Sequence, residues 1–128
     1  MTSNFPQFIF GVEALGLDNQ HDYVAHLPAS LHDREALFAA LQQSIGLPEY
    51  FGQNWDALSE CLRDLSWIKQ RRVVLLHEGV PQLDPQSLKV YLEVLSECVR
   101  DWRPNEEHQF VVVFPRDAAN RINEMLAQ

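Results

Sequence analysis

The sequence is poor in cysteine, in glycine and in basic residues. Its 128 residues include two cysteines, five glycines, and ten lysines and arginines against eighteen aspartates and glutamates, which gives a net charge of −8. Cys61 and Cys98 each stand alone inside a helical pattern, so we expect buried thiols and no disulfide framework. So negative a surface disfavours nucleic acid and anionic membranes as partners, because both would repel it.

Long hydrophobic runs and targeting signals are also missing. No apolar stretch approaches the roughly 20 residues that would cross a bilayer. The N-terminus lacks the basic region and apolar core of a signal peptide, so we predict a cytoplasmic protein. With 46% hydrophobic and 22% charged residues, a chain of this length is expected to bury a core without a disulfide or a metal.

The usual motifs of catalysis and cofactor binding are absent as well. The sequence has no glycine-rich nucleotide loop, no GxSxG and no paired CxxC. "HEGVP", which begins at His77, starts like a zinc-protease helix, but Pro81 stands where the second histidine is required. We therefore expect no metal and no cofactor.

What the sequence does contain is an alternation of strand and helix patterns. Three segments have the composition of strands, two of them with the continuous apolar runs of a buried parallel sheet (residues 23–27, 71–78 and 110–114). Four segments have helical spacing or capping signals (from Asp33 to Gly46, from Asn54 to about Leu65, from Leu88 to Trp102, and a short one from Asp117).

This order predicts an α/β fold with a small three-stranded parallel β-sheet packed against helices. Residues 1–20 are interpreted as an N-terminal extension, either an extra strand or a loop. Residues 21–128 are interpreted as the main domain, which ends in a short C-terminal helix. A monomer is expected.

Three carboxylates form a row on the second predicted helix. Asp56, Glu60 and Asp64 are four residues apart, so they share a face, and each like-charged pair costs a few tenths of a kcal/mol. The helix dipole near Asp56 and the neighbouring Arg63 offset part of this cost. The row is compatible with an idle solvated face, with a surface that binds cations, or with a hydrolytic pair that recruits His77.

Cation binding suits the row better than hydrolysis. A general acid needs a pocket and a partner across the substrate, whereas two carboxylates on one exposed helix straddle nothing. Tyr50, Phe51 and Gly52 precede the row and offer aromatic and bare backbone surface beside the charge. That combination suits the arginine and lysine side chains of a partner protein.

The stretch "LPEYFGQNWDALSECL", Leu47 to Leu62, resembles the signature of the barstar family, the intracellular inhibitors of secreted microbial ribonucleases. The family pattern runs Leu-Pro-x-Tyr-aromatic-Gly-x-Asn-hydrophobic-Asp-Ala-Leu-x-acidic-Cys-Leu. A looser similarity extends from about Tyr23 to Phe114. The resemblance implies a barstar-like fold and an immunity-like inhibitor in place of an enzyme. It also implies a basic secreted ribonuclease or related toxin as the partner.

The resemblance also implies roles for individual residues. Tyr50, Gly52, Asp56 and Glu60 would fill the ribonuclease's cationic active site, and Glu97 would be a further acid on the long helix. Trp67 would match a family tryptophan after the acidic helix. The predicted partner-binding surface is therefore made of one loop, the helix after it and two outlying residues (Tyr50, Phe51, Gly52, Asn54, Asp56, Ser59, Glu60, Arg63, Asp64, Trp67 and Glu97).

Two of these residues depart from the founding protein of the family. Glu60 stands in place of an aspartate and Ser59 in place of an aromatic residue, so the partner need not be the familiar one. The alternatives are a small hydrolase that uses Asp56 and Glu60, and a regulatory module whose partner is not a nuclease.

Overall fold

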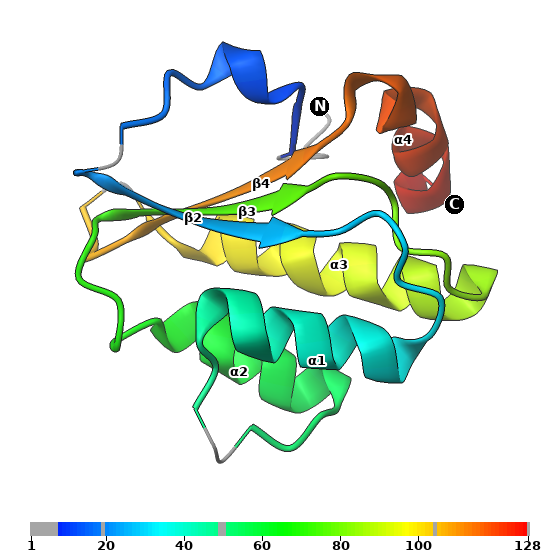
Figure 1. The fold of residues 1–128 in the computed structure, drawn as a ribbon, viewed down its shortest axis with the longest axis horizontal. Helices are drawn as coiled ribbons and strands as arrows, with labels where there is room; N and C mark the ends of the chain where they lie inside the picture. Colours follow the sequence, from blue (N-terminus) through cyan, green and yellow to red (C-terminus); the bar gives the residue numbers. More distant parts are fainter. Residues whose placement is uncertain (1–7, 19, 49–50, 104, 128) are drawn as a thin grey trace.

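The computed structural model describes residues 8–18, 20–48, 51–103 and 105–127, and it has the predicted alternation of strands and helices (Figure 1). The elements follow in the order β1 (Ile9–Phe10), the 3₁₀ turn η1 (Val12–Ala14), β2 (Asp22–Leu27), α1 (Arg34–Ile45), α2 (Trp55–Asp64), β3 (Arg72–His77), α3 (Pro85–Asp101), β4 (Gln109–Phe114), the 3₁₀ turn η2 (Arg116–Ala118) and α4 (Ala119–Ala127). The predicted α/β class is confirmed.

The sheet in the described chain has four parallel strands in the order β1-β4-β3-β2. The sheet thus has one strand more than the three predicted for the main domain, and this strand comes from the N-terminal segment that was left open as a strand or a loop. The additional strand, β1, lies in the N-terminal segment and pairs Ile9 with Val113 and Phe10 with Phe114. A strand of two residues has no periodicity for a sequence pattern to detect, and its pairing covers an edge of β4 that would otherwise be open.

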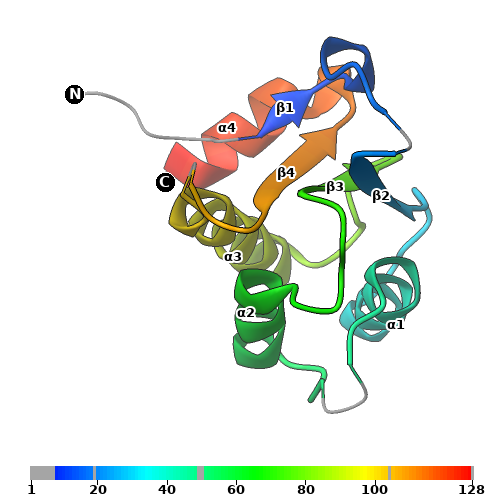
Figure 2. The same cartoon turned by 90° about the vertical axis from the view of Figure 1, so that its left-hand side faces the viewer.

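The chain crosses the sheet on both faces. From β1 it runs over one face to β2 at the opposite edge, and it then returns through β3 to β4 with α1, α2 and α3 on the other face (Figures 1 and 2). The connection from β1 to β2 and the connections from β2 through β3 to β4 run in opposite directions along the sheet and over opposite faces. The crossovers therefore all have the same handedness. The prediction of strands buried on both faces is also confirmed, since Val73 and Leu75 face the helices while Val74 packs against the N-terminal side.

Side-chain caps set the starts of the first two helices as predicted. The Asp33 carboxylate accepts a hydrogen bond from the Ala36 amide at 2.7 Å, and the Asn54 side chain accepts one from the Ala57 amide at 2.8 Å. Gly46 ends α1 with a φ of 72°, a conformation that favours glycine. Gly46 and Asn54 thus fix where α1 stops and where α2 begins.

An ion pair fastens the N-terminal segment to the sheet. Asp22 and Arg72 face each other across β2 and β3, and Nε and Nη2 of Arg72 each donate to the Asp22 carboxylate at 2.7 Å. Arg72 Nη2 also reaches the carbonyl oxygens of Leu15 and Gly16 at 3.5 and 3.4 Å. The Asp22 side chain is 3% exposed, and its bonds from Arg72 lower its pKa.

Asp22→Asn is expected to lower the free energy of unfolding by about 2 kcal/mol. Breaking a fully buried pair costs roughly 3–5 kcal/mol, but the Arg72 side chain is 24% exposed and keeps some access to water. Urea unfolding at pH 7 measures the loss. The control is Glu13→Gln, which removes the exposed ion pair between Glu13 and Arg116 and should cost less than about 1 kcal/mol. Equal losses for the two variants would contradict the structural importance of Asp22.

Candidate partner-binding surface

Two sets of contacts hold the described residues just before α2. Phe51 is 6% exposed and packs edge-on against Phe38, with 5.6 Å between ring centroids. Asn54 caps α2, and its Nδ2 donates to the Gly52 carbonyl oxygen at 3.3 Å. Gly52 itself is exposed. The Phe51 side chain therefore lies in the core and not on the predicted surface. From the core it holds the neighbouring Gly52 in place. Tyr50 lies outside the described residues.

The predicted acidic row lies on the exposed face of α2. Asp56, Glu60 and Asp64 are all exposed, while Leu58, Cys61 and Leu62 on the opposite side are buried. Asp64 accepts a hydrogen bond from the Ser66 hydroxyl at 3.1 Å. No ion pair joins Asp56 or Glu60 to another residue in the described ranges. The two carboxylates that precede Asp64 are thus open to an external cation.

A seam between α2 and α3 borders the row. The Cys98 sulfur lies 3.8 Å from the Ser59 carbonyl oxygen and 4.0 Å from the Ser59 hydroxyl oxygen. Trp102 Nε1 donates a hydrogen bond to the Leu62 carbonyl oxygen at 2.8 Å. Ser59 is therefore half-buried against α3, in place of lying on the open face.

Arg63 crosses this seam. Its Nη2 lies 3.0 Å from an oxygen of Asp101 and 3.7 Å from an oxygen of Glu97. The structure thus brings the predicted Arg63 and Glu97 together, and it adds Asp101, which the sequence interpretation missed. Asp101 follows Glu97 by four residues on the same helix, a spacing that could have indicated it.

The comparison with known families bears on the whole of this region. Residues 24–115 match the family model described as Barstar (barnase inhibitor). The chain belongs to the barstar family. The match extends from β2 past the end of β4, so it contains the loop, α2 and the acids of α3. A search of curated proteins found no match.

Trp67, which was assigned through the resemblance to this family, has a structural contact in the described chain. Its Nε1 donates to the Ile45 carbonyl at 3.0 Å, and its ring lies beside Gly46. The half-buried indole therefore ties the segment after α2 to the end of α1.

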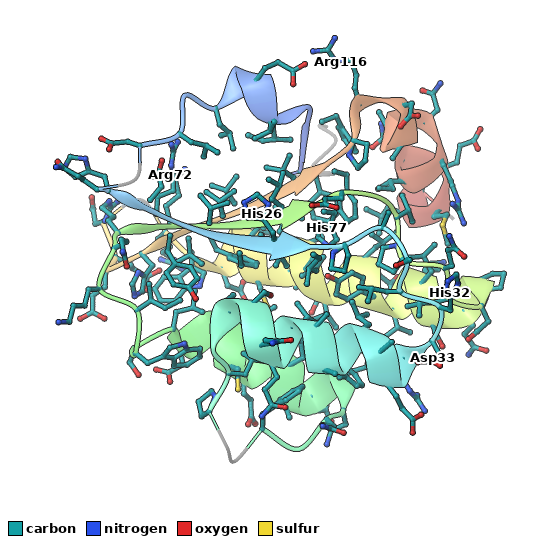
Figure 3. The ribbon with its side chains drawn as sticks, viewed as in Figure 1. His26, His32, Asp33, Arg72, His77 and Arg116 are labelled. Carbon is teal, nitrogen blue, oxygen red and sulfur yellow. The ribbon has the colours of Figure 1, made fainter. Side chains whose placement is uncertain are left out.

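The hydrolytic alternative required His77 beside the carboxylates of α2. His77 is 2% exposed and lies between the sheet and α3, where Nδ1 is 3.0 Å from the Val113 carbonyl and Nε2 is 2.7 Å from the Tyr91 hydroxyl (Figure 3). Both nitrogens are occupied, and the ring stacks on Phe114. Asp56 and Glu60 lie on the outer face of α2, so the three groups do not converge. The family description is that of an inhibitor.

Two other kinds of site were sought in the described part of the chain. Within it, no group of three or more His, Cys, Asp and Glu side chains is placed to hold a metal ion. None of the helices there is both long enough and apolar enough to span a membrane.

Proposed function

We propose that this member of the barstar family is a monomeric cytoplasmic inhibitor of a basic secreted ribonuclease. Asp56 and Glu60 would enter the enzyme's active site, where arginine, lysine and protonated histidine groups bind the phosphates of RNA. Carboxylates make strong charge-assisted hydrogen bonds with such groups. The observation that carries the proposal is the exposed, unneutralised row on α2 inside the segment that matches a barnase-inhibitor family.

The described residues just before α2 support this role because contacts within the protein already hold them. Phe51 packs into the core and Asn54 holds the Gly52 carbonyl, so these residues lose less conformational freedom on binding. Tyr50 is proposed to pack over the enzyme's active site, and Gly52 to let the enzyme approach the backbone closely.

The overall charge supports the same partner. A net charge of −8 attracts a basic enzyme before contact, and this long-range attraction weakens as salt shortens the screening length. Association should therefore be fastest at low ionic strength.

The proposal is tested by adding the protein to a panel of basic secreted microbial ribonucleases and following RNA hydrolysis. We expect at least one enzyme to lose its activity in proportion to the protein added, with complete loss near one equivalent. If every enzyme in the panel stays active and none is captured, the proposal is wrong.

Asn54→Ala is expected to weaken ribonuclease binding beyond its effect on stability. Losing an N-cap costs about 1 kcal/mol, and this substitution also removes the bond to the Gly52 carbonyl. Asp33→Ala is the matched control, because it removes the equivalent cap of α1. Both variants should lose similar stability in urea, whereas only Asn54→Ala should raise the dissociation constant, by about tenfold for roughly 1.4 kcal/mol. Equal binding by both variants would show that the loop geometry does not matter.

A further inference from the structure

A positive charge is built into the acidic surface at Arg63. Its guanidinium is held by Asp101 and Glu97, and the three side chains are 44%, 44% and 54% exposed. Arg63 follows Glu60 by three residues on α2, and its contacts show that it points towards α3. It therefore stands between the acidic row of α2 and the two acids of α3.

The surrounding contacts fix this position. On one side Ser59 packs against Cys98, and on the other Trp102 donates to the Leu62 carbonyl. The distance between the helices is thus set by their own packing. Both acids lie near the same terminal nitrogen, Nη2, which carries two N–H donors, so Arg63 can face both acids while remaining exposed at the surface.

The ion pairs divide the acidic surface into two parts with different charge. No described residue forms an ion pair with Asp56 or Glu60. Glu97 and Asp101 share one positive charge. Arg63 occupies the place between them that an arginine of a partner would otherwise take, and it weakens their attraction for a second cation. The predicted contact of Glu97 with the partner is here replaced by an ion pair within the protein.

We infer that Arg63 is a specificity-determining residue that confines cation recognition to the acidic row of α2. Its identification as a determinant of ribonuclease choice rests on the proposed function. The partner it fits has its basic groups in a narrow patch opposite Asp56 and Glu60 and no cation opposite the seam between α2 and α3. Enzymes with a broader basic surface are disfavoured.

A partner-independent experiment tests the local effect. Hexa-arginine peptide is titrated at low salt into wild type, Arg63→Gln, Arg63→Lys and Arg121→Gln, and the side-chain carboxyl carbon shifts are followed by NMR. Arg121 is an exposed residue of α4, so its replacement changes the net charge equally but leaves the seam intact. Arg63→Lys keeps the charge, and circular dichroism verifies that each variant is folded.

In wild type, Arg63→Lys and Arg121→Gln, the peptide should move the carboxyl carbon resonances of Asp56 and Glu60. The resonances of Glu97 and Asp101 should stay nearly unchanged. In Arg63→Gln the shifts should spread to Glu97 and Asp101. The peptide should also bind about three- to sixfold more tightly, as expected for removing one like charge about 4–6 Å away in water. The inference is overturned if the peptide shifts the α3 acids equally in wild type and Arg63→Gln, or if Arg121→Gln gains as much affinity.

The same variants, tested on the ribonuclease panel, separate this inference from the proposed function. Arg63→Gln should bind the more broadly basic enzymes with a higher affinity than wild type, and Arg121→Gln should not show this increase. If the peptide results are as expected but no variant binds any ribonuclease, the proposed function is wrong and the role of Arg63 in cation selection stands. If ribonucleases bind but Arg63→Gln shows no gain over Arg121→Gln, Arg63 does not set the choice of enzyme.

Discussion

Asp56→Ala is expected to weaken binding to the cognate ribonuclease by about a hundredfold to a thousandfold. A carboxylate about 4 Å from a guanidinium contributes roughly 4 kcal/mol at an effective dielectric constant near 20, before desolvation is subtracted. Each 1.4 kcal/mol is about a factor of ten in the dissociation constant. Asp56 is exposed and has no ion-pair partner in the described chain, so its removal costs the free protein little.

Isothermal titration calorimetry at fixed salt measures this loss. Asp117→Ala is the matched control, because Asp117 is an exposed aspartate of η2, away from α2. The control changes the long-range attraction by the same one charge, so a larger effect at Asp56 reports direct contact. Glu60→Ala should also bind much more weakly. Equal affinities for Asp56→Ala and Asp117→Ala would mean that the row on α2 is not the contact surface.

Lowering the pH from 7 to 4 is expected to reduce the free energy of unfolding by about 3 kcal/mol through His77. Burial lowers the pKa of His77 from 6.5 to about 4 in the folded protein. Below pH 6.5 the unfolded chain therefore binds a proton that the folded chain refuses, and stability falls until the pH reaches the folded value. Each unit of difference is worth about 1.4 kcal/mol.

The hydrogen bonds of His77 explain why the ring stays neutral. The Val113 carbonyl can only accept, so Nδ1 carries the hydrogen, and Nε2 accepts from the Tyr91 hydroxyl. Burial raises the pKa of Tyr91 well above its ordinary value, so the tyrosine remains a donor. Protonation of Nε2 would break this bond and place a charge in the core.

Urea unfolding between pH 7 and pH 4 tests the role of His77. In His77→Gln the fall in stability over this range should become much smaller, whereas His26→Gln, which alters an exposed residue of β2, should keep the wild-type slope. His21 acts in the opposite direction, because its bond with Asp18 raises its pKa, and this contribution is common to all three proteins. An unchanged slope in His77→Gln would contradict the assignment.

The parts of the fold that were predictable are those with local causes. The caps at Asp33 and Asn54 follow from side chains that accept first-turn amides, and the continuous run at β3 follows from burial on both faces. β1 was left open as a strand or a loop because its two residues form a strand only where β4 offers an edge.

The part of the candidate site that depends only on the spacing of residues along one helix could be predicted from the sequence. Asp56 and Glu60 share a face because of helical periodicity. The pairing of Arg63 with Asp101 depends on how α2 packs against α3, which no local pattern contains. Phe51 was placed on the surface because it adjoins Tyr50 in the sequence. The Phe51 amide donates to the Pro48 carbonyl, and the Phe51 ring lies in the core beside Phe38.

Competition with substrate tests the proposed inhibition most directly. Ribonuclease activity is measured at rising protein concentration in the presence of several concentrations of RNA. If Asp56 and Glu60 occupy the phosphate sites, more RNA should raise the apparent inhibition constant in proportion, and a non-cleavable oligonucleotide should displace the protein. Inhibition that is independent of RNA concentration, or a stable complex that contains enzyme, oligonucleotide and protein together, would contradict binding through the active site.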